Sequence, residues 1–320
     1  MNRTTLRPGR SKLFVAFAAA AALAVSFAVS AAMAGNSEQA SWTDGCGTDV
    51  FNSVNSLATG ASLARGGPGL REPSLSETVT DVTPQRGRGR NFRATVPTYV
   101  HVVYHADGTG NVSNKAINDQ IQVLNMTFGG FEGGYRTGFG FELAGITRTA
   151  NTTWYLAGPS TSGERAMKRT LHTGGDNALN LYLTTAGPYL GWAYYPNQTE
   201  HNGSAYLDGI VVDGESMLGT STTYLNRYDK GETDTHEAGH WLNLAHTFEG
   251  GCNNWGDHVD DTPPMLVPTN GCPAGKDTCN EPGLDPIHNY MDYSYDTCYT
   301  QFTQGQALRA QDAWLRYRAS

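Results

Sequence analysis

The stretch HEAGHWLNLAH, residues 236–246, decides how this chain is organised. His236 and His240 are four residues apart, so on a helix they lie one turn apart on the same face. Both imidazoles can then reach a single metal ion. His246 follows six residues after the second histidine and adds a third nitrogen ligand. Three nitrogen ligands with one open position are typical of a catalytic zinc site.

Glu237 lies beside the first histidine and can polarise a metal-bound water. Two histidines and a glutamate at this spacing indicate a zinc peptidase. The alternative is a polar helix face that carries histidines by chance, and the third histidine at a fixed offset argues against it. We therefore expect His236, His240 and His246 to bind the metal.

Asn243 departs from the longer form of this pattern, which has glycine between the second and third ligands. The chain must leave the helix there to bring His246 round to the metal. Such a turn usually needs a residue with positive φ, and asparagine is the next best residue after glycine. The sequence therefore predicts a positive φ at Asn243.

Composition limits the class of protein. The chain has 320 residues, a formal net charge of −8, 38 glycines and 39% hydrophobic residues. This is enough for one sizeable core, and too much glycine for a mostly helical protein. The acidic balance argues against nucleic acid as a partner.

The N-terminus has the pattern of an export signal. A basic segment ending at Lys12 precedes an apolar run over residues 13–31, and AMA at 32–34 resembles a cleavage site. We expect residues 1–34 to be a signal peptide of a secreted protein. The apolar run is longer than a usual signal core, so an uncleaved membrane anchor is the alternative.

Residues 35–90 are rich in Gly, Ser, Thr and Pro and end in the basic run QRGRGR, residues 85–90. Such a run is an open target for proteolysis. We expect a pro-segment over 35–90, removed between Arg86 and Arg93, and a catalytic domain over 91–320. The alternative is a passive linker.

Hydrophobic periodicity predicts an α+β fold for the last part of the chain. We expect a twisted mixed sheet with a backing helix and the metal-binding helix, above an irregular lower part that ends in a C-terminal helix. The expected strands are 98–105, 139–146, 179–184, 190–195 and 209–212, and the expected helices are 117–128, one starting near Thr233 and one starting at Thr303. Thr303 and Gln306 form a capping box for the last helix.

Five cysteines are present, and four of them, Cys252, Cys272, Cys279 and Cys298, lie in the C-terminal part. In an exported chain these four suggest two disulfides, with three possible pairings. A zinc site built from all four thiolates is the alternative, although the short C-x-x-C spacing is missing. Cys46 stands alone far upstream.

These features together resemble a metzincin zinc metalloprotease of the pappalysin family, the group that includes ulilysin and cytophagalysin-type proteases. The segments that carry the resemblance are HEAGHWLNLAH with the following TFEGGC (247–252), GDHVDDTP (256–263), NYMDY (289–293), Cys298 with FTQGQ (302–306), LGWAY (190–194) and CGT (46–48). The resemblance covers residues 92–318 well and 35–90 thinly. It implies a secreted, latent zinc endopeptidase that acts on protein or peptide substrates, as a monomer without stable membrane association.

The resemblance also implies roles for single residues. Glu237 is the expected general base, Met291 the Met-turn beneath the zinc, and Tyr293 a donor to the tetrahedral intermediate, where the alternative is an ordinary core or surface tyrosine. The expected substrate-binding edge strand contains Gly191, Trp192 and Ala193. Asp296 could line the pocket for the residue after the cut and favour Arg or Lys.

Three further expectations follow from the resemblance. The implied disulfides are Cys252–Cys279 and Cys272–Cys298. Calcium is implied in the loops after the metal-binding helix, with Asp257, Asp260 and Asp261 as oxygen ligands; a solvated acidic loop is the alternative. Cys46 could ligate the zinc and hold the precursor latent, where the alternative is a stray or intermolecular thiol.

A competing function is a binding or adhesion protein on an inactive protease scaffold, and a third is a zinc hydrolase of a non-peptide bond.

Overall fold

The computed structural model describes residues 1, 89, 91–200, 203–253 and 256–319. The expected signal peptide and pro-segment, with Cys46, lie outside the described residues apart from positions 1 and 89. In the part of the chain that is described, no helix is both long and apolar enough to cross a membrane.

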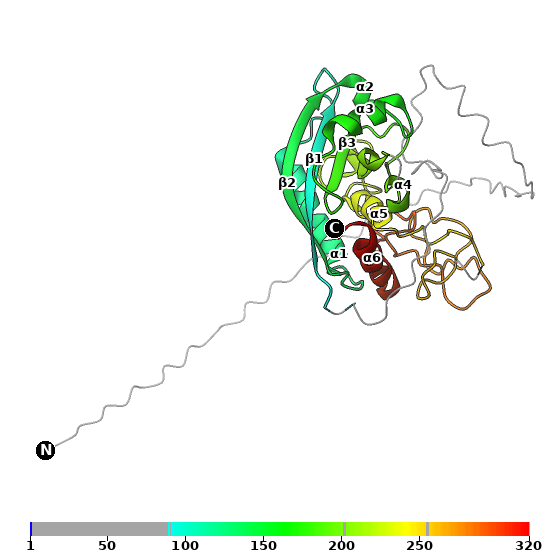
Figure 1. Ribbon diagram of the computed structural model, residues 1–320. Helices are drawn as coiled ribbons and strands as arrows, with labels where there is room; N and C mark the ends of the chain where they lie inside the picture. The colour runs from blue at the N-terminus through cyan, green and yellow to red at the C-terminus, as the bar shows by residue number, and fades with distance from the viewer. Residues whose placement is uncertain (2–88, 90, 201–202, 254–255, 320) are drawn as a thin grey trace, which may run out of the picture. The chain divides into compact units, whose positions relative to one another are not determined.

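A five-stranded sheet with the order β2-β1-β3-β5-β4 organises the domain (Figure 1). All its neighbouring pairs are parallel except β4, which lies antiparallel to β5 at the edge. Each predicted strand forms, although β1 begins four residues earlier than predicted and β4 has three of the six residues expected. The strands are β1 (Ala94–Tyr104), β2 (Phe139–Ala150), β3 (Leu179–Thr184), β4 (Gly191–Ala193) and β5 (Ile210–Asp213).

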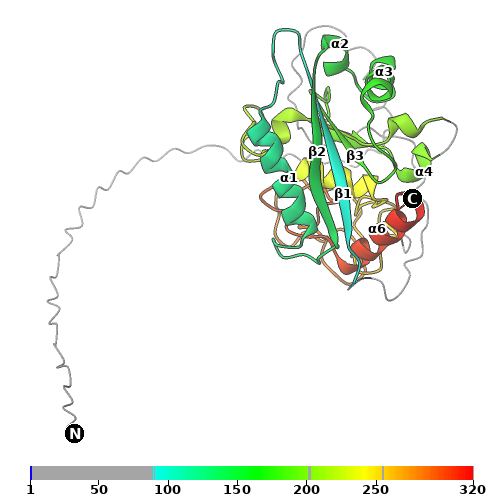
Figure 2. The ribbon, with the colours of Figure 1, turned by 60° about the vertical axis from the view of Figure 1, so that its left-hand side comes forward.

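Helices cover both faces of the sheet, which explains why β3 is buried along its whole length. Leu181 and Leu183 face the main core, which α1 (Asn114–Phe128) and α5 (Glu232–Trp241) complete. Tyr182, between them, faces a second cluster with Met167 of α3 (Ser162–Leu171). Figure 2 shows α1 and α3 on opposite sides of the strands.

Helix α1 is the predicted backing helix. The hydroxyl of Ser113 accepts a hydrogen bond from the Ala116 N–H and caps its N-terminus. Its buried stripe, at helical spacing, is Ile117, Ile121, Leu124 and Phe128. The aromatic ring of Phe128 lies 5.0 Å from Phe141 and 4.8 Å from Phe302, so α1 joins the sheet to the C-terminal part.

Several short helices were not predicted: α2 (Thr152–Tyr155), α3, α4 (Pro196–Thr199) and the 3₁₀ turns η2 (Ala205–Leu207) and η3 (Gly214–Ser216). Hydrophobic periodicity did not predict helix α3, for a physical reason. Its three buried residues are Glu164, Met167 and Lys168, so it has no apolar stripe for a periodicity argument to find.

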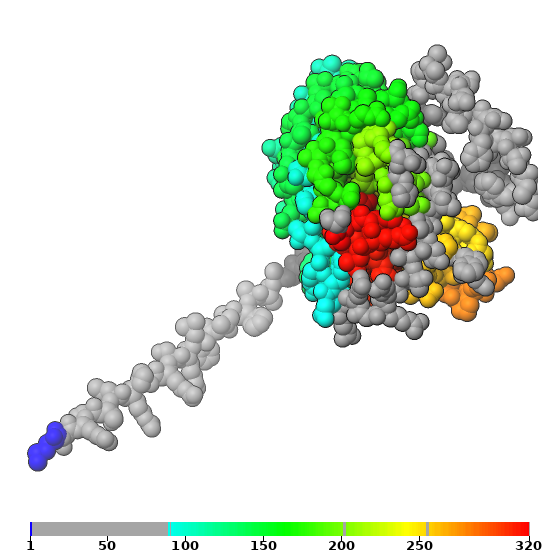
Figure 3. Space-filling view, in the orientation of Figure 1, coloured from blue at the N-terminus to red at the C-terminus, as the bar shows by residue number. Residues whose placement is uncertain are grey.

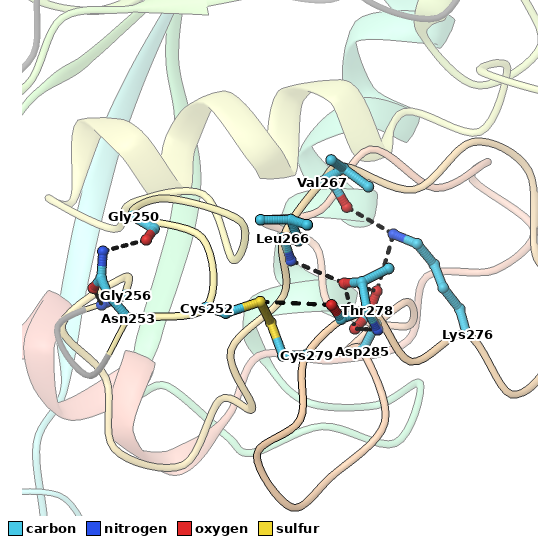
Figure 4. The surroundings of a disulfide bond; sticks show 10 residues. All are labelled: Gly250, Cys252, Asn253, Gly256, Leu266, Val267, Lys276, Thr278, Cys279 and Asp285. Carbon is cyan, nitrogen blue, oxygen red and sulfur yellow. Dashed lines mark hydrogen bonds and ion pairs between the residues drawn. A yellow bond between two sulfur atoms is a disulfide. The ribbon is translucent and has the colours of Figure 1, made fainter. Parts of the chain in front are cut away.

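The lower part of the domain has almost no regular structure in its described residues between α5 and the last helix. The disulfides Cys252–Cys279 and Cys272–Cys298 hold it together, in the pairing that the resemblance implied. Figure 4 shows a polar cluster next to the first disulfide. The buried Asp285 carboxylate accepts hydrogen bonds from the Thr278 N–H and hydroxyl, and Lys276 Nζ lies 3.1 Å from it.

Helix α6 (Gln304–Tyr317) closes the fold. It starts after Thr303, and both hydrogen bonds of the predicted capping box with Gln306 are present. In Figure 3 this helix, in red, lies on the surface below the green sheet and α3 region. Its buried Trp314 packs against Phe139 and Trp241, linking the helix to the sheet and to α5.

Candidate metal centre

Three imidazoles converge at the end of α5. Nε2 of His240 lies 3.1 Å from Nε2 of His236 and 3.1 Å from Nε2 of His246. A tetrahedral zinc ion about 2.0–2.1 Å from each nitrogen requires the nitrogens to be about 3.3 Å apart. All three histidines are buried, with 2–6% of their surface exposed. The donor set therefore fits a zinc ion.

The opposite ring nitrogens of these histidines fix their tautomers. Nδ1 of His236 lies 2.5 Å from the Tyr290 carbonyl oxygen, and Nδ1 of His240 lies 2.7 Å from the Leu244 carbonyl oxygen. A carbonyl oxygen can only accept, so Nδ1 carries the hydrogen in both rings and Nε2 keeps its lone pair. Nδ1 of His246 lies 3.5 Å from the Glu249 carboxylate, which orients the third ring.

Asn243 makes the turn that brings His246 to the other two ligands. Its φ is 68°, as predicted, and it is fully buried. The Asn243 carbonyl accepts a hydrogen bond of 2.9 Å from Nε of Arg309 in α6. The C-terminal helix thus supports the turn directly, which the sequence did not indicate.

Met291 is fully buried and lies against Gly239, the residue before His240 in α5. A Cβ atom on Gly239 would overlap the Met291 sulfur, so the glycine of α5 is what lets the methionine approach. The Met291 carbonyl accepts a hydrogen bond from the Thr247 N–H at 3.1 Å, which connects this turn to the residue after His246.

Glu237 is 1% exposed and points from α5 toward the edge strand β4. An added Cβ on Gly191 would be 2.8 Å from Glu237 Oε1 and 2.8 Å from the Val211 carbonyl oxygen. Gly191, expected only as part of the substrate strand, therefore also provides the space for the Glu237 carboxylate.

Tyr293 lies beside two of the histidines. Its ring centroid is 5.1 Å from that of His246 and 5.7 Å from that of His236. Phe248, which the sequence analysis did not single out, stacks on the His246 ring at 4.7 Å with an interplanar angle of 12° and also contacts Tyr293. This aromatic group holds the third ligand in place.

A pocket opens next to Glu237 and His236 and runs to Asp296. Two buried carboxyl groups line it, Glu232 from the first turn of α5 and Asp296 from the segment after Met291. Burial, followed by the proximity of Asp296, raises the pKa of Glu232 to about 10. Asp296 Oδ2 accepts a hydrogen bond of 2.8 Å from the Lys230 N–H. Leu190, Tyr228, Thr233, Tyr293 and Tyr299 complete the lining.

Two of the three expected calcium ligands accept hydrogen bonds from the protein in the described part of the chain. Asp257 accepts hydrogen bonds of 2.7 and 2.8 Å from the Thr262 hydroxyl, and Asp261 accepts one from the Gly305 N–H. These two aspartates and Asp260 are not among the described groups whose ligand atoms lie within 4.8 Å of one another. Burial raises the pKa of Asp257 to about 7.

Comparison with known proteins places these features in context. A family model described as "Peptidase_M43: Pregnancy-associated plasma protein-A" matches residues 177–314. Extracellular metalloprotease 1 of Coccidioides posadasii is 43% identical over 228 residues, covering 70% of this chain and 78% of that protein. An extracellular metalloprotease of Arthroderma benhamiae is 36% identical over 282 residues, covering 84% and 90%.

Among solved structures, mature mirolysin of Tannerella forsythia in complex with a cleaved peptide is similar, with a TM-score of 0.58 and 31% identity. The match covers 68% of this chain and 90% of mirolysin. A mutant of Tannerella forsythia promirolysin gives a TM-score of 0.59 at 28% identity, covering 71% and 82%.

Proposed function

This chain belongs to the pappalysin (M43) family of metzincin metalloproteases, and we propose that it is a secreted zinc endopeptidase with Glu237 as its general base. The observation that carries the proposal is the convergence of three Nε2 atoms beside a buried glutamate. Secretion is supported by the relatives' printed name, extracellular metalloprotease, and by the N-terminal pattern.

Zinc bound by His236, His240 and His246 supplies the Lewis acidity that makes a water nucleophilic near neutral pH. Glu237 accepts the proton of the attacking water as the peptide carbonyl is attacked, and then delivers a proton to the leaving amine. Its burial supports this role, because a carboxylate shielded from bulk water exchanges protons with the reacting groups alone.

Tyr293 is the proposed donor to the oxyanion of the tetrahedral intermediate. Its ring lies against His236 and His246, which would hold the metal, so Tyr293 is next to the place where the oxyanion would form. A preorganised donor of this kind typically contributes about 10²–10³ in kcat. Met291 contributes packing beneath the histidines and takes no chemical part.

The substrate lies along β4 in this proposal. Strand β4 pairs with β5 on one side and is the last strand of the sheet. A peptide can therefore add to its open edge through main-chain hydrogen bonds. The protein substrate passes in this way between the edge strand and the α5 histidines.

We further propose that the pocket at Glu232 and Asp296 prefers Arg or Lys after the cleaved bond. Glu232 and Asp296 share this pocket, and the raised pKa keeps Glu232 protonated there; an entering cation favours the charged form of both carboxyl groups. Asp296→Asn should lower kcat/KM for a peptide with Arg at this position about tenfold or more, and leave a Leu peptide nearly unchanged. Equal losses for both peptides would exclude the assignment.

Latency belongs to the same proposal, with residues 1–34 as signal peptide, 35–90 as pro-segment and Cys46 as the group that blocks the zinc. Support comes from the sequence alone, since Cys46 lies outside the described residues. A Cys46→Ala precursor should activate itself faster than the wild-type precursor. Unchanged latency would leave Cys46 without this role.

Casein digestion by the mature enzyme, with and without a chelator, tests the proposed function. We expect cleavage that the chelator abolishes and added zinc restores. A chain that binds zinc but cleaves neither casein nor a peptide library would instead be a binding protein on an inactive scaffold.

A further inference from the structure

Among the described residues the edge strand β4 pairs with β5 alone, and it is three residues long. Its side chains alternate between the two faces of the sheet. Ala193 packs into the core that contains α5, while Trp192 and the following Tyr194 pack into the cluster that contains Met167 of α3. So short an edge strand needs side-chain contacts to keep a fixed position.

Glu164 of α3 supplies such contacts. Trp192 donates its indole N–H to Oε1 at 2.8 Å, and Tyr194 donates its hydroxyl to Oε2 at 2.9 Å. The Ser160 N–H donates to Oε2 at 2.6 Å, and Lys168 Nζ lies 3.4 Å from Oε1. One carboxylate therefore joins the strand to α3 through two side chains.

Glu164 and Lys168 are both fully buried. Burial lowers the pKa of Lys168, while the neighbouring Glu164 carboxylate opposes that shift. A buried ion pair is weak evidence for stability, because hydrophobic residues of similar volume often replace one without loss. The geometry of this pair points instead to a role in fixing the position of what it binds.

The other face of the same segment contacts the metal centre. Gly191 packs against the carboxylate of Glu237, and the Tyr195 hydroxyl lies 3.1 Å from Nδ1 of His240. The segment that α3 holds in place is therefore also the segment that borders the metal centre.

We propose that Glu164 is a positioning residue for peptide hydrolysis: through Trp192 and Tyr194 it fixes the edge strand on which the substrate binds. This inference rests on the proposed peptidase function and extends it to the far side of the sheet. Glu164 itself touches neither substrate nor metal in this account.

The test uses Trp192→Phe and Tyr194→Phe, each of which removes one hydrogen bond to Glu164 and keeps an aromatic ring. Tyr182→Phe is the matched control. Tyr182 is a buried tyrosine of the same cluster, and among the described residues its hydroxyl has no hydrogen-bond partner. All variants are made in the full chain, matured, and checked for zinc content.

Two fluorogenic peptides with the same residues around the cut are compared, one of about four residues and one of about ten. Only the longer peptide can extend along the whole segment 190–195, which contains β4, whereas the shorter one covers only part of it. Loss of one hydrogen bond to a charged group should raise KM for the longer peptide about tenfold, with kcat within twofold. The shorter peptide and the Tyr182→Phe variant should change less than twofold.

Glu164 is tested in a Glu164→Gln/Lys168→Met background, which removes both buried charges together. The double variant should show the same rise in KM for the longer peptide. Adding Trp192→Phe to it should change KM less than twofold further, because two changes that act through one group are not additive.

The inference is overturned if Trp192→Phe and Tyr194→Phe behave like the Tyr182→Phe control. Equal losses for both peptides, or reduced zinc content, would overturn it as well, since they indicate general structural damage. A wild-type enzyme that cleaves neither peptide would refute the proposed function itself, so the two failures are distinguishable.

Discussion

Gly191→Ala should disable the enzyme from the edge strand, without touching a metal ligand. The new Cβ would be 2.8 Å from Glu237 Oε1 and 2.8 Å from the Val211 carbonyl oxygen, whereas ordinary contacts begin at 3.4 Å. The difference is about 0.6 Å, and the Val211 contact is backbone on β5, so the strand cannot simply move away from the glutamate.

The new Cβ would displace the Glu237 carboxylate, which is the group that must reach the attacking water. A misplacement of 1 Å can reduce a rate about 10²-fold, so we expect kcat to fall about 10- to 100-fold for a shift of this size. Overpacking should also lower the free energy of unfolding by about 1–3 kcal/mol. None of the three atoms nearest to the new methyl group belongs to an imidazole, so zinc content should stay at the wild-type level.

Gly158→Ala is the matched control, because an added Cβ there meets no atom within 4 Å and the backbone conformation is not left-handed. The assay is the initial rate of peptide hydrolysis by zinc-saturated enzyme, with zinc measured by mass spectrometry. A Gly191→Ala enzyme with a wild-type kcat would refute the placement of Glu237 against β4.

Two further predictions concern the turn and the pocket. Asn243→Ala should lower the free energy of unfolding by about 1–2 kcal/mol and weaken zinc binding, because a positive φ is unfavourable for alanine. Asn243→Gly should keep the wild-type zinc affinity. Equal zinc affinity in the two variants, measured by titration with a chelator, would contradict this. Glu232 has its pKa raised to about 10 from 4.5 by burial, so the folded protein binds the extra proton and stability falls as pH rises between those values. Glu232→Gln should therefore raise Tm more at pH 8 than at pH 5, and an equal change at both pH values would count against a protonated Glu232.

The metal ligands could be predicted from the sequence because their geometry is local. A spacing of four on a helix and one turn residue determine where His236, His240 and His246 lie, and the positive φ of Asn243 followed from the same reasoning. The strands could be predicted because each lies in a short run of residues that favour β-structure, such as valine, isoleucine and tyrosine. The ends of β1 and β4 were not, since pairing with neighbouring strands decides where a strand stops.

Contacts between distant segments could not be predicted from one sequence. Glu232 and Asp296 meet in one pocket although they are far apart in the chain, and Arg309 supports Asn243 from the last helix. Helix α3 was missed because its buried side includes a glutamate and a lysine, residues that a hydrophobic pattern assigns to the surface. The disulfide pairing could not be chosen from spacing alone, and only the family resemblance selected it.

The proposed mechanism depends above all on Glu237 as the general base of a zinc peptidase. The most direct measurement is kcat of zinc-saturated Glu237→Gln on a peptide that the wild-type enzyme cleaves. We expect a fall of about 10²–10⁴-fold with full zinc occupancy, the usual contribution of general base catalysis. A Glu237→Gln enzyme that holds zinc and keeps a near wild-type kcat would contradict it.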